Sequence, residues 1–126
     1  QKRKTIAKLY DKIFKNKNYL TIPKIEKNSS HAFHLYPLRV NFKKLNIDKS
    51  YLFKKMKKCK INLQVHYNPV HLQPIFKKNY HFKNGQFPQA EKFYREEVSL
   101  PIYFSLSLTN VRKIANLLIK FCESNK

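Results

Sequence analysis

Apolar side chains recur at helical spacing near both ends of this chain, and no other feature constrains the fold as strongly. Near the start they lie on one side of a predicted helix: Ile6, Leu9, Tyr10, Ile13 and Phe14. A second stripe spans residues 110–123, where Ser107 or Thr109 could cap the helix. One-sided stripes of this kind are typical of helices packed on a core.

Extended and helical patterns alternate between these two helices. Residues 20–25, around Pro23, and 32–42 are predicted to be extended, and Pro37 favours an edge position or a bulge in the second. The clearest strand is 61–67, because its side chains alternate: Ile61, Leu63, Val65 and Tyr67 on one face, and Asn62, Gln64 and His66 on the other. The other predicted elements are a helix over 48–58 that starts at Asp48, an irregular stretch to about Gly85, a helix over 88–97 with Ala90, Phe93 and Tyr94 inward, and a short extended piece over 99–103.

Length and composition indicate a single packed domain. The chain has 126 residues, 42% of them hydrophobic, which is enough for a core and argues against disorder along the whole length. The order of elements predicts an α+β fold, with helices packed on a small mixed sheet. Because the chain starts with Gln1, inside a helical pattern, we expect a fragment whose natural beginning lies upstream.

Two features bear on the compartment. No apolar run has the length of a membrane-spanning helix, and no secretory signal opens the sequence, so we expect no membrane partner. Cys59 and Cys122 lie on apolar helix stripes without a CxxC spacing, which predicts buried free thiols. Both features favour a cytoplasmic protein.

The net charge of +20 raises the alternative of a small basic nucleic-acid-binding module. Its composition argues against one, because Lys outnumbers Arg by 23 to 4 and Arg is the side chain suited to bidentate phosphate and base contacts. The lysines are spread along the chain, with one dense cluster in residues 54–60. A solvated helix face explains this cluster, so we do not expect nucleic acid as a partner.

Catalysis by this chain alone has little support in the sequence. The single glycine excludes a phosphate-cradling glycine loop, and none of the seven acidic residues forms an evident acid–base pair. A zinc site at Cys59, His66 and His71 would lack a fourth ligand at a familiar spacing, so no metal is expected. The densest polar and aromatic stretch is residues 62–74, where Gln64 and His66 share the polar face of the predicted strand.

Four blocks together resemble the C-terminal domain of the DegT/DnrJ/StrS sugar aminotransferases. They are residues 30–40, 63–74, 85–94 and 97–103, in the order and spacing of that family, and the likeness extends over residues 1–126. The resemblance implies the small domain of a fold-type I aminotransferase that depends on pyridoxal 5'-phosphate (PLP). It also implies a homodimer that transfers an amino group from glutamate to a UDP-4-keto-6-deoxy-HexNAc.

The resemblance further implies that two domains of such an enzyme bind different groups, the N-terminal domain PLP and the C-terminal domain the nucleotide sugar. In the family the PLP-binding lysine lies in an N-terminal domain that is absent from this sequence, and none of the 23 lysines here sits in that motif. We therefore expect the chain alone to bind no PLP and to be inactive. Gln64, Val65, His66 and Tyr67 match the family segment that contacts the nucleotide sugar. An inactive remnant is the remaining alternative, and the aromatics from Tyr67 to Phe87 are expected to be exposed in the absence of a partner.

Overall fold

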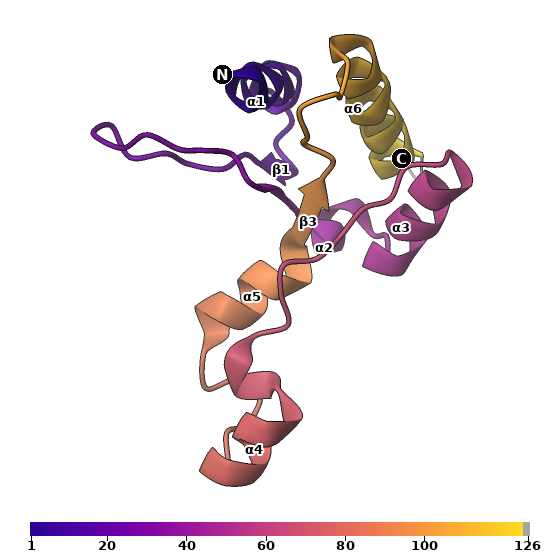
Figure 1. Ribbon diagram of the computed structural model, residues 1–126. Helices are drawn as coiled ribbons and strands as arrows, with labels where there is room; N and C mark the ends of the chain where they lie inside the picture. Colours follow the sequence, from indigo (N-terminus) through magenta and orange to yellow (C-terminus); the bar gives the residue numbers. More distant parts are fainter. Residues whose placement is uncertain (125–126) are drawn as a thin grey trace.

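The computed structural model describes residues 1–124. Figure 1 shows helices on both sides of a short sheet, with the loop over residues 22–35 and the segment over residues 68–87 extending away from it. In chain order the elements are α1 (Lys2–Phe14), β1 (Leu20–Thr21), β2 (Tyr36–Val40), α2 (Phe42–Leu45), α3 (Lys49–Lys58), a 3-10 turn (Val70–Leu72), α4 (Pro74–Tyr80), α5 (Pro88–Glu96), β3 (Glu97–Leu100) and α6 (Leu108–Glu123).

The three strands form a sheet in the order β1-β2-β3. Both pairings are antiparallel, with Leu20 opposite Val40 and Leu38 opposite Val98. The prediction of helices on a small sheet is confirmed, whereas the mixed sheet is wrong. No parallel partner joins β2 within residues 1–124, because both neighbouring strands run antiparallel to it.

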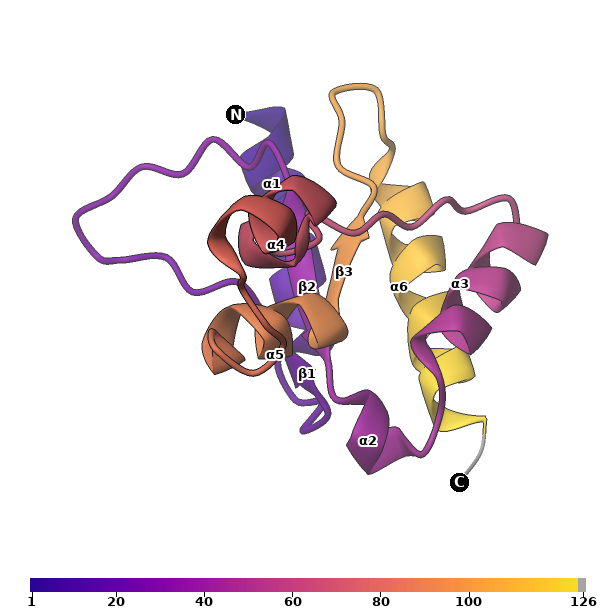
Figure 2. The ribbon, with the colours of Figure 1, turned by 90° about the horizontal axis from the view of Figure 1, so that it is seen from below.

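The core lies where α1, α3 and α6 meet the sheet. Helix α1 packs against α6, and α6 packs against α3 on its other side (Figure 2). Tyr10 is fully buried in α1 and donates a hydrogen bond from its hydroxyl to the carbonyl of Pro101 at 3.0 Å. Tyr36 of β2 is equally buried and donates to Asp11 Oδ1 at 2.6 Å. These two bonds join the first helix to the sheet and to the segment after β3.

The predicted strand over residues 61–67 is not formed. Its apolar alternation is real, since Ile61 and Leu63 are buried and Gln64 is exposed. However, only Gln64 pairs with the sheet, through one antiparallel bridge to Ser99. Pairing stops there because the next inward amide, His66 N–H, donates to the side chain of Glu97 at 3.0 Å.

Pro37 occupies the central strand rather than an edge strand. One side of β2 is nevertheless unpaired at Pro37, as in an edge strand. The reason is that β1 is two residues long and pairs only with Arg39 and Val40. On that side of β2 no strand within residues 1–124 lies opposite Pro37, so the missing amide proton interrupts no hydrogen-bond ladder there.

Residues 68–87 form a projection that we call the arm. It contains the 3-10 turn and α4, where an irregular stretch was predicted, and it extends beyond α5 away from the core (Figure 1). Helix α4 has no buried residue. The predicted exposure of aromatics in this region is confirmed at Tyr67, Tyr80 and Phe87, which are 71%, 62% and 46% exposed.

Helix α5 starts at Pro88 as predicted, but two of its three predicted inward residues are wrong. Ala90 and Phe93 are exposed and Tyr94 is half-buried, whereas the buried residue is Glu91. The helix lies between the sheet and the arm (Figure 1), and Glu91 is buried because it bonds to His71 and to the Gly85 amide of the arm. No helix among residues 1–124 is long and apolar enough to cross a membrane.

Candidate functional site

A pocket of about 380 Å³ lies beside β3 and contains two of the four predicted site residues. Gln64 and His66 line it from the segment that follows α3, and Ser99 lines it from β3. The remaining wall comes from α1, from the loop before β2, from the segment after α3 and from the residues around β3: Arg3, His34, Leu35, Asn62, Leu100, Pro101, Ile102 and Tyr103.

Backbone pairing holds Gln64 at the pocket. Its amide donates to the Ser99 carbonyl at 3.3 Å, and the Ser99 amide donates to the Gln64 carbonyl at 2.8 Å. The Gln64 side chain is exposed, so its amide donors and its carbonyl acceptor are accessible for other contacts.

The His66 ring is held by a buried polar cluster on β3. Its Nδ1 lies 2.8 Å from Ser99 Oγ, and the Ser99 hydroxyl donates in turn to Glu97 Oε1. Glu97 is fully buried, and its Oε2 accepts the His66 backbone N–H. A buried carboxylate is tolerated when hydrogen bonds satisfy it. We call Glu97, Ser99 and His66 the β3 cluster.

Lys49 supplies positive charge near the β3 cluster. Burial lowers the pKa of its ammonium, and the charge of Glu97 opposes that shift. The Lys49 ammonium donates to the Tyr94 carbonyl at 2.8 Å and lies 5.2 Å from the centre of the Tyr94 ring. This amine is therefore engaged with α5.

Val65 and Tyr67 lie outside the pocket. Val65 lines a separate apolar groove of about 640 Å³, together with Phe53 and Tyr94. Tyr67 is 71% exposed, and its ring stands edge-on to the His66 ring at 4.7 Å. The peptide bond between His66 and Tyr67 is cis. The structure thus brings Gln64 and His66 together and leaves the other two predicted residues at the margins.

Glu97 and Ser99 were not predicted from the sequence as candidate site residues. Both lie in the block 97–103 that carries the family resemblance, but neither was assigned a role. One signal was available, because Glu97 is an acidic residue that directly precedes the apolar Val98. A carboxylate in such a strand needs a buried partner.

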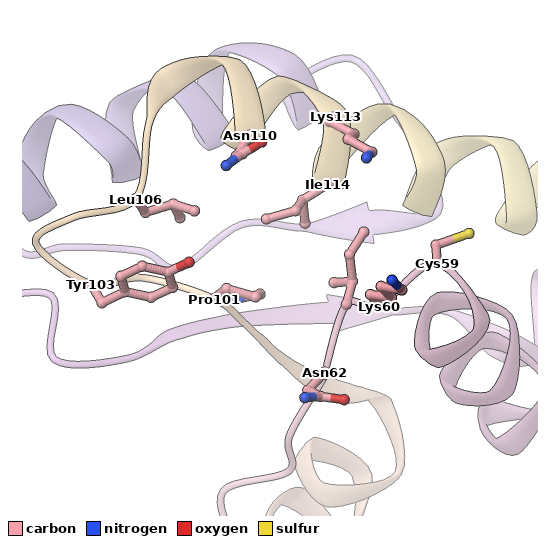
Figure 3. A pocket seen from close by; sticks show the side chains of 10 residues that line it. Cys59, Lys60, Asn62, Pro101, Tyr103, Leu106, Asn110, Lys113 and Ile114 are labelled. Atoms are coloured by element: carbon pink, nitrogen blue, oxygen red, sulfur yellow. The ribbon is translucent and has the colours of Figure 1, made fainter.

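A second pocket of about 410 Å³ adjoins the first and shares Asn62, Pro101 and Tyr103 with it. Figure 3 shows Asn110, Lys113 and Ile114 of α6 on one side of this pocket. The end of α3 closes the other side with Cys59 and Lys60. Cys59 is half-buried here, which corrects the prediction of a fully buried thiol, whereas Cys122 is buried as predicted. The difference arises because Cys59 follows the end of α3 at the pocket, whereas Cys122 lies on the buried face of α6.

His71 belongs to a different polar contact, at the base of the arm. Its Nε2 lies 3.1 Å from Glu91 Oε1, and both residues are buried. The Gly85 amide donates to the same oxygen at 2.7 Å. The Gly85 bond and then His71 lower the pKa of Glu91. Among residues 1–124 no group of three His, Cys, Asp or Glu side chains could hold a metal ion.

Comparison with known proteins relates this architecture to one family of enzymes. The family model of the DegT/DnrJ/EryC1/StrS aminotransferases matches residues 1–119. The UDP-4-amino-4,6-dideoxy-N-acetyl-beta-L-altrosamine transaminase of Helicobacter pylori is 35% identical over 128 aligned residues, which cover 100% of this chain and 33% of the relative.

Solved structures agree with the sequence matches. Helicobacter pylori PseC, an aminotransferase involved in the biosynthesis of pseudoaminic acid, superposes with a TM-score of 0.85 at 33% identity, covering 98% of this chain and 33% of PseC. Spr1654 of Streptococcus pneumoniae, solved in its PMP form, gives a TM-score of 0.84 at 26% identity and covers 100% of this chain and 31% of Spr1654. The chain thus spans about a third of the length of the relatives that it matches.

Proposed function

Because this chain belongs to the DegT/DnrJ/EryC1/StrS aminotransferase family, we propose that it forms the sugar-nucleotide side of the active site in a PLP-dependent aminotransferase. The complete enzyme transfers an amino group from glutamate to a UDP-4-keto-6-deoxy-HexNAc. The single observation that carries the proposal is the placement of Gln64 and His66 in one pocket, with the His66 ring held by the β3 cluster.

Each residue of the segment 64–67 has a role that follows from its surroundings. Gln64 and His66 offer uncharged hydrogen-bonding groups, which suit the hydroxyl and amide groups of an N-acetylated sugar. The exposed ring of Tyr67 is available to stack on a base or sugar face, and Val65 adds apolar contact from the neighbouring groove. Arg3 lines the same pocket and supplies a cation for the diphosphate.

We assign no residue of this chain to the cofactor. When bound in the complete enzyme, PLP acts as the electron sink that allows an amino group to move to or from a carbonyl carbon. Lys49 is the half-buried lysine whose pKa is lowered, yet its ammonium is bonded to the Tyr94 carbonyl. In the proposed enzyme the PLP-binding lysine belongs to an N-terminal domain. The complete chain, with both domains, forms a cytoplasmic homodimer. The exposed apolar side chains of the arm support a role in such contacts.

The test is a His66→Ala substitution in the complete enzyme. Loss of one hydrogen bond to the sugar costs about 0.5–1.5 kcal/mol, and up to about 3 if the bonded group is charged. We expect kcat/KM for the sugar nucleotide to fall by several-fold to roughly a hundred-fold, with the absorption spectrum of the cofactor unchanged.

His81→Asn is the matched control for this experiment. His81 lies in the arm with a positive φ of 55°, a conformation that Asn tolerates, and it does not line the pocket. Its replacement should leave kcat/KM unchanged. If His66→Ala instead lowered thermal stability and cofactor content while KM for the sugar nucleotide stayed constant, His66 would be a structural residue.

A further inference from the structure

The single hydroxyl proton of Ser99 has two possible partners in the β3 cluster. The partner that receives it determines which ring nitrogen of His66 carries a proton. Ser99 Oγ stands between Glu97 Oε1 and His66 Nδ1, at hydrogen-bonding distance from both. A hydroxyl has one proton to donate and lone pairs with which to accept. Ser99 therefore donates to one neighbour and accepts from the other.

The surroundings of Glu97 decide which neighbour receives that proton. Its other oxygen, Oε2, already accepts the backbone N–H of His66 at 3.0 Å. At Oε1 the carboxyl group is likewise an acceptor, because the Ser99 hydroxyl donates to it. The Ser99 proton consequently points to Glu97, and the Ser99 lone pair faces His66 Nδ1.

We propose that Glu97 and Ser99 are positioning residues that keep His66 in its Nδ1-protonated form, so that Nε2 presents a hydrogen-bond acceptor to the pocket. His66 Nε2 makes no hydrogen bond with any group in residues 1–124, and it is not a buried atom lacking a partner. It is the ring nitrogen left for a ligand.

The consequence is a rule for ligand recognition, and it rests on the function proposed above. A neutral acceptor nitrogen binds a hydroxyl or amide N–H of the sugar, and it disfavours a phosphate oxygen, which is itself an acceptor. Of the pocket side chains, Arg3 is the donor suited to phosphate. His66 therefore selects for a donor group on the sugar ring, while the diphosphate is oriented toward Arg3.

The ring state can be measured on the 126-residue chain without any ligand. Nitrogen-15 NMR at about pH 8, where ordinary histidines are neutral, separates protonated from unprotonated ring nitrogens. We expect a proton on Nδ1 and an unprotonated signal at Nε2 of His66. Ser99→Ala removes the acceptor for Nδ1–H and should shift the ring toward the Nε2-protonated form, whereas Ser99→Thr keeps a hydroxyl and should preserve the wild-type signal.

Two controls separate this effect from a general disturbance. His34 lines the same pocket without a bond to Ser99, so its ring signals should not change in Ser99→Ala. Ser105→Ala, in the exposed loop after β3, should leave His66 unchanged. A proton on Nε2 in the wild-type chain, or an unchanged His66 ring in Ser99→Ala, overturns the proposal.

Ligand discrimination is tested in the complete enzyme with UDP-N-acetylhexosamines in which one hydroxyl at a time is replaced by fluorine. Fluorine cannot donate a hydrogen bond. At one ring position the fluorinated analogue should therefore bind to wild type roughly ten-fold more weakly than the unmodified sugar nucleotide does, whereas His66→Ala should bind the two equally well. Equal losses in both proteins at every position overturn the recognition rule. Failure of every UDP-sugar to bind would instead refute the proposed function, while the NMR result would still decide the ring state.

Discussion

Buried polar side chains in this domain are consistently paired. Tyr36 bonds to Asp11, His71 bonds to Glu91, and Glu97 bonds to Ser99. Within residues 1–124 no buried side-chain nitrogen or oxygen lacks a hydrogen-bond partner. Because an unpaired buried polar group costs about 1–3 kcal/mol, each of these contacts constrains which residues can lie side by side.

The two thiols provide a residue-level prediction. Burial, together with the charge of Glu123, raises the pKa of Cys122 to about 12, and its side chain is 1% exposed. Cys59 is half-buried and lines the open pocket of Figure 3. Since the thiolate is the reactive form, a thiol reagent at about pH 8 should modify Cys59 well before Cys122. Cys59→Ser should abolish the fast phase, and equal rates for both thiols would contradict the assignment.

Helix α6 carries a large share of the core. Its buried residues face α1 and α3, and Leu118 is fully buried among them. The stripe at helical spacing predicted in the sequence is therefore the face that holds the outer helices together.

Leu118→Ala should lower the free energy of unfolding by about 2–5 kcal/mol, because the cavity adds to the lost apolar transfer. Urea denaturation of the chain measures the change. Lys120→Ala on the exposed face of the same helix should change stability by no more than about 0.5 kcal/mol. Similar losses for both variants would show that α6 does not pack as described.

The attachment of the arm should depend on pH through Glu91. The Gly85 amide and then His71 lower its pKa, so the carboxylate stabilises the folded arm above the ordinary Glu pKa of about 4.3. That stabilisation should disappear as the pH falls through the lower pKa of the folded state. Hydrogen exchange of the Gly85 amide should report the loss.

Glu91→Gln should increase Gly85 amide exchange by roughly several-fold at neutral pH, because the charge-assisted bond is replaced by a weaker neutral one. Glu26→Gln, in the exposed loop between β1 and β2, is the control and should have no effect. Slow exchange in Glu91→Gln would mean that other contacts hold the arm.

At the scale of the whole molecule, a packed core is combined with an arm that has few contacts of its own. The exposed apolar residues Val70, Ile75 and Tyr80 are each more than 60% exposed and lie on this arm. Exposed apolar patches of this kind commonly mark interaction surfaces. This agrees with a chain that spans about a third of its relatives.

The chain alone should neither retain PLP nor transfer amino groups. Incubation with PLP, borohydride reduction and peptide mapping should label no single lysine, because Lys49 is engaged with Tyr94 and the exposed lysines are equivalent in solvent. The complete enzyme, treated in the same way, is the positive control. Specific labelling of one lysine in the isolated chain would contradict the division of labour proposed above.

The sequence by itself determined α1, α3, α5 and α6 and the shared face of two candidate site residues, but not α2 or α4. Apolar spacing located α1, α3 and α6, and Ser107 caps α6 as anticipated by accepting the Asn110 amide at 3.2 Å. Local signals suffice here because helix contacts and caps join residues three or four positions apart. The same period argument placed Gln64 and His66 on one polar face, and both line the pocket.

Only the tertiary structure decided how His66 is held and what else surrounds it. Ser99 lies 33 residues and Glu97 lies 31 residues from His66 in sequence, and they meet it because β3 runs antiparallel to the segment around Gln64. The same arrangement explains why the predicted strand over 61–67 is not formed. The His66 N–H donates to the Glu97 side chain and so cannot extend the backbone pairing that starts at Gln64. Such contacts depend on strand register, which a local pattern of side chains does not contain.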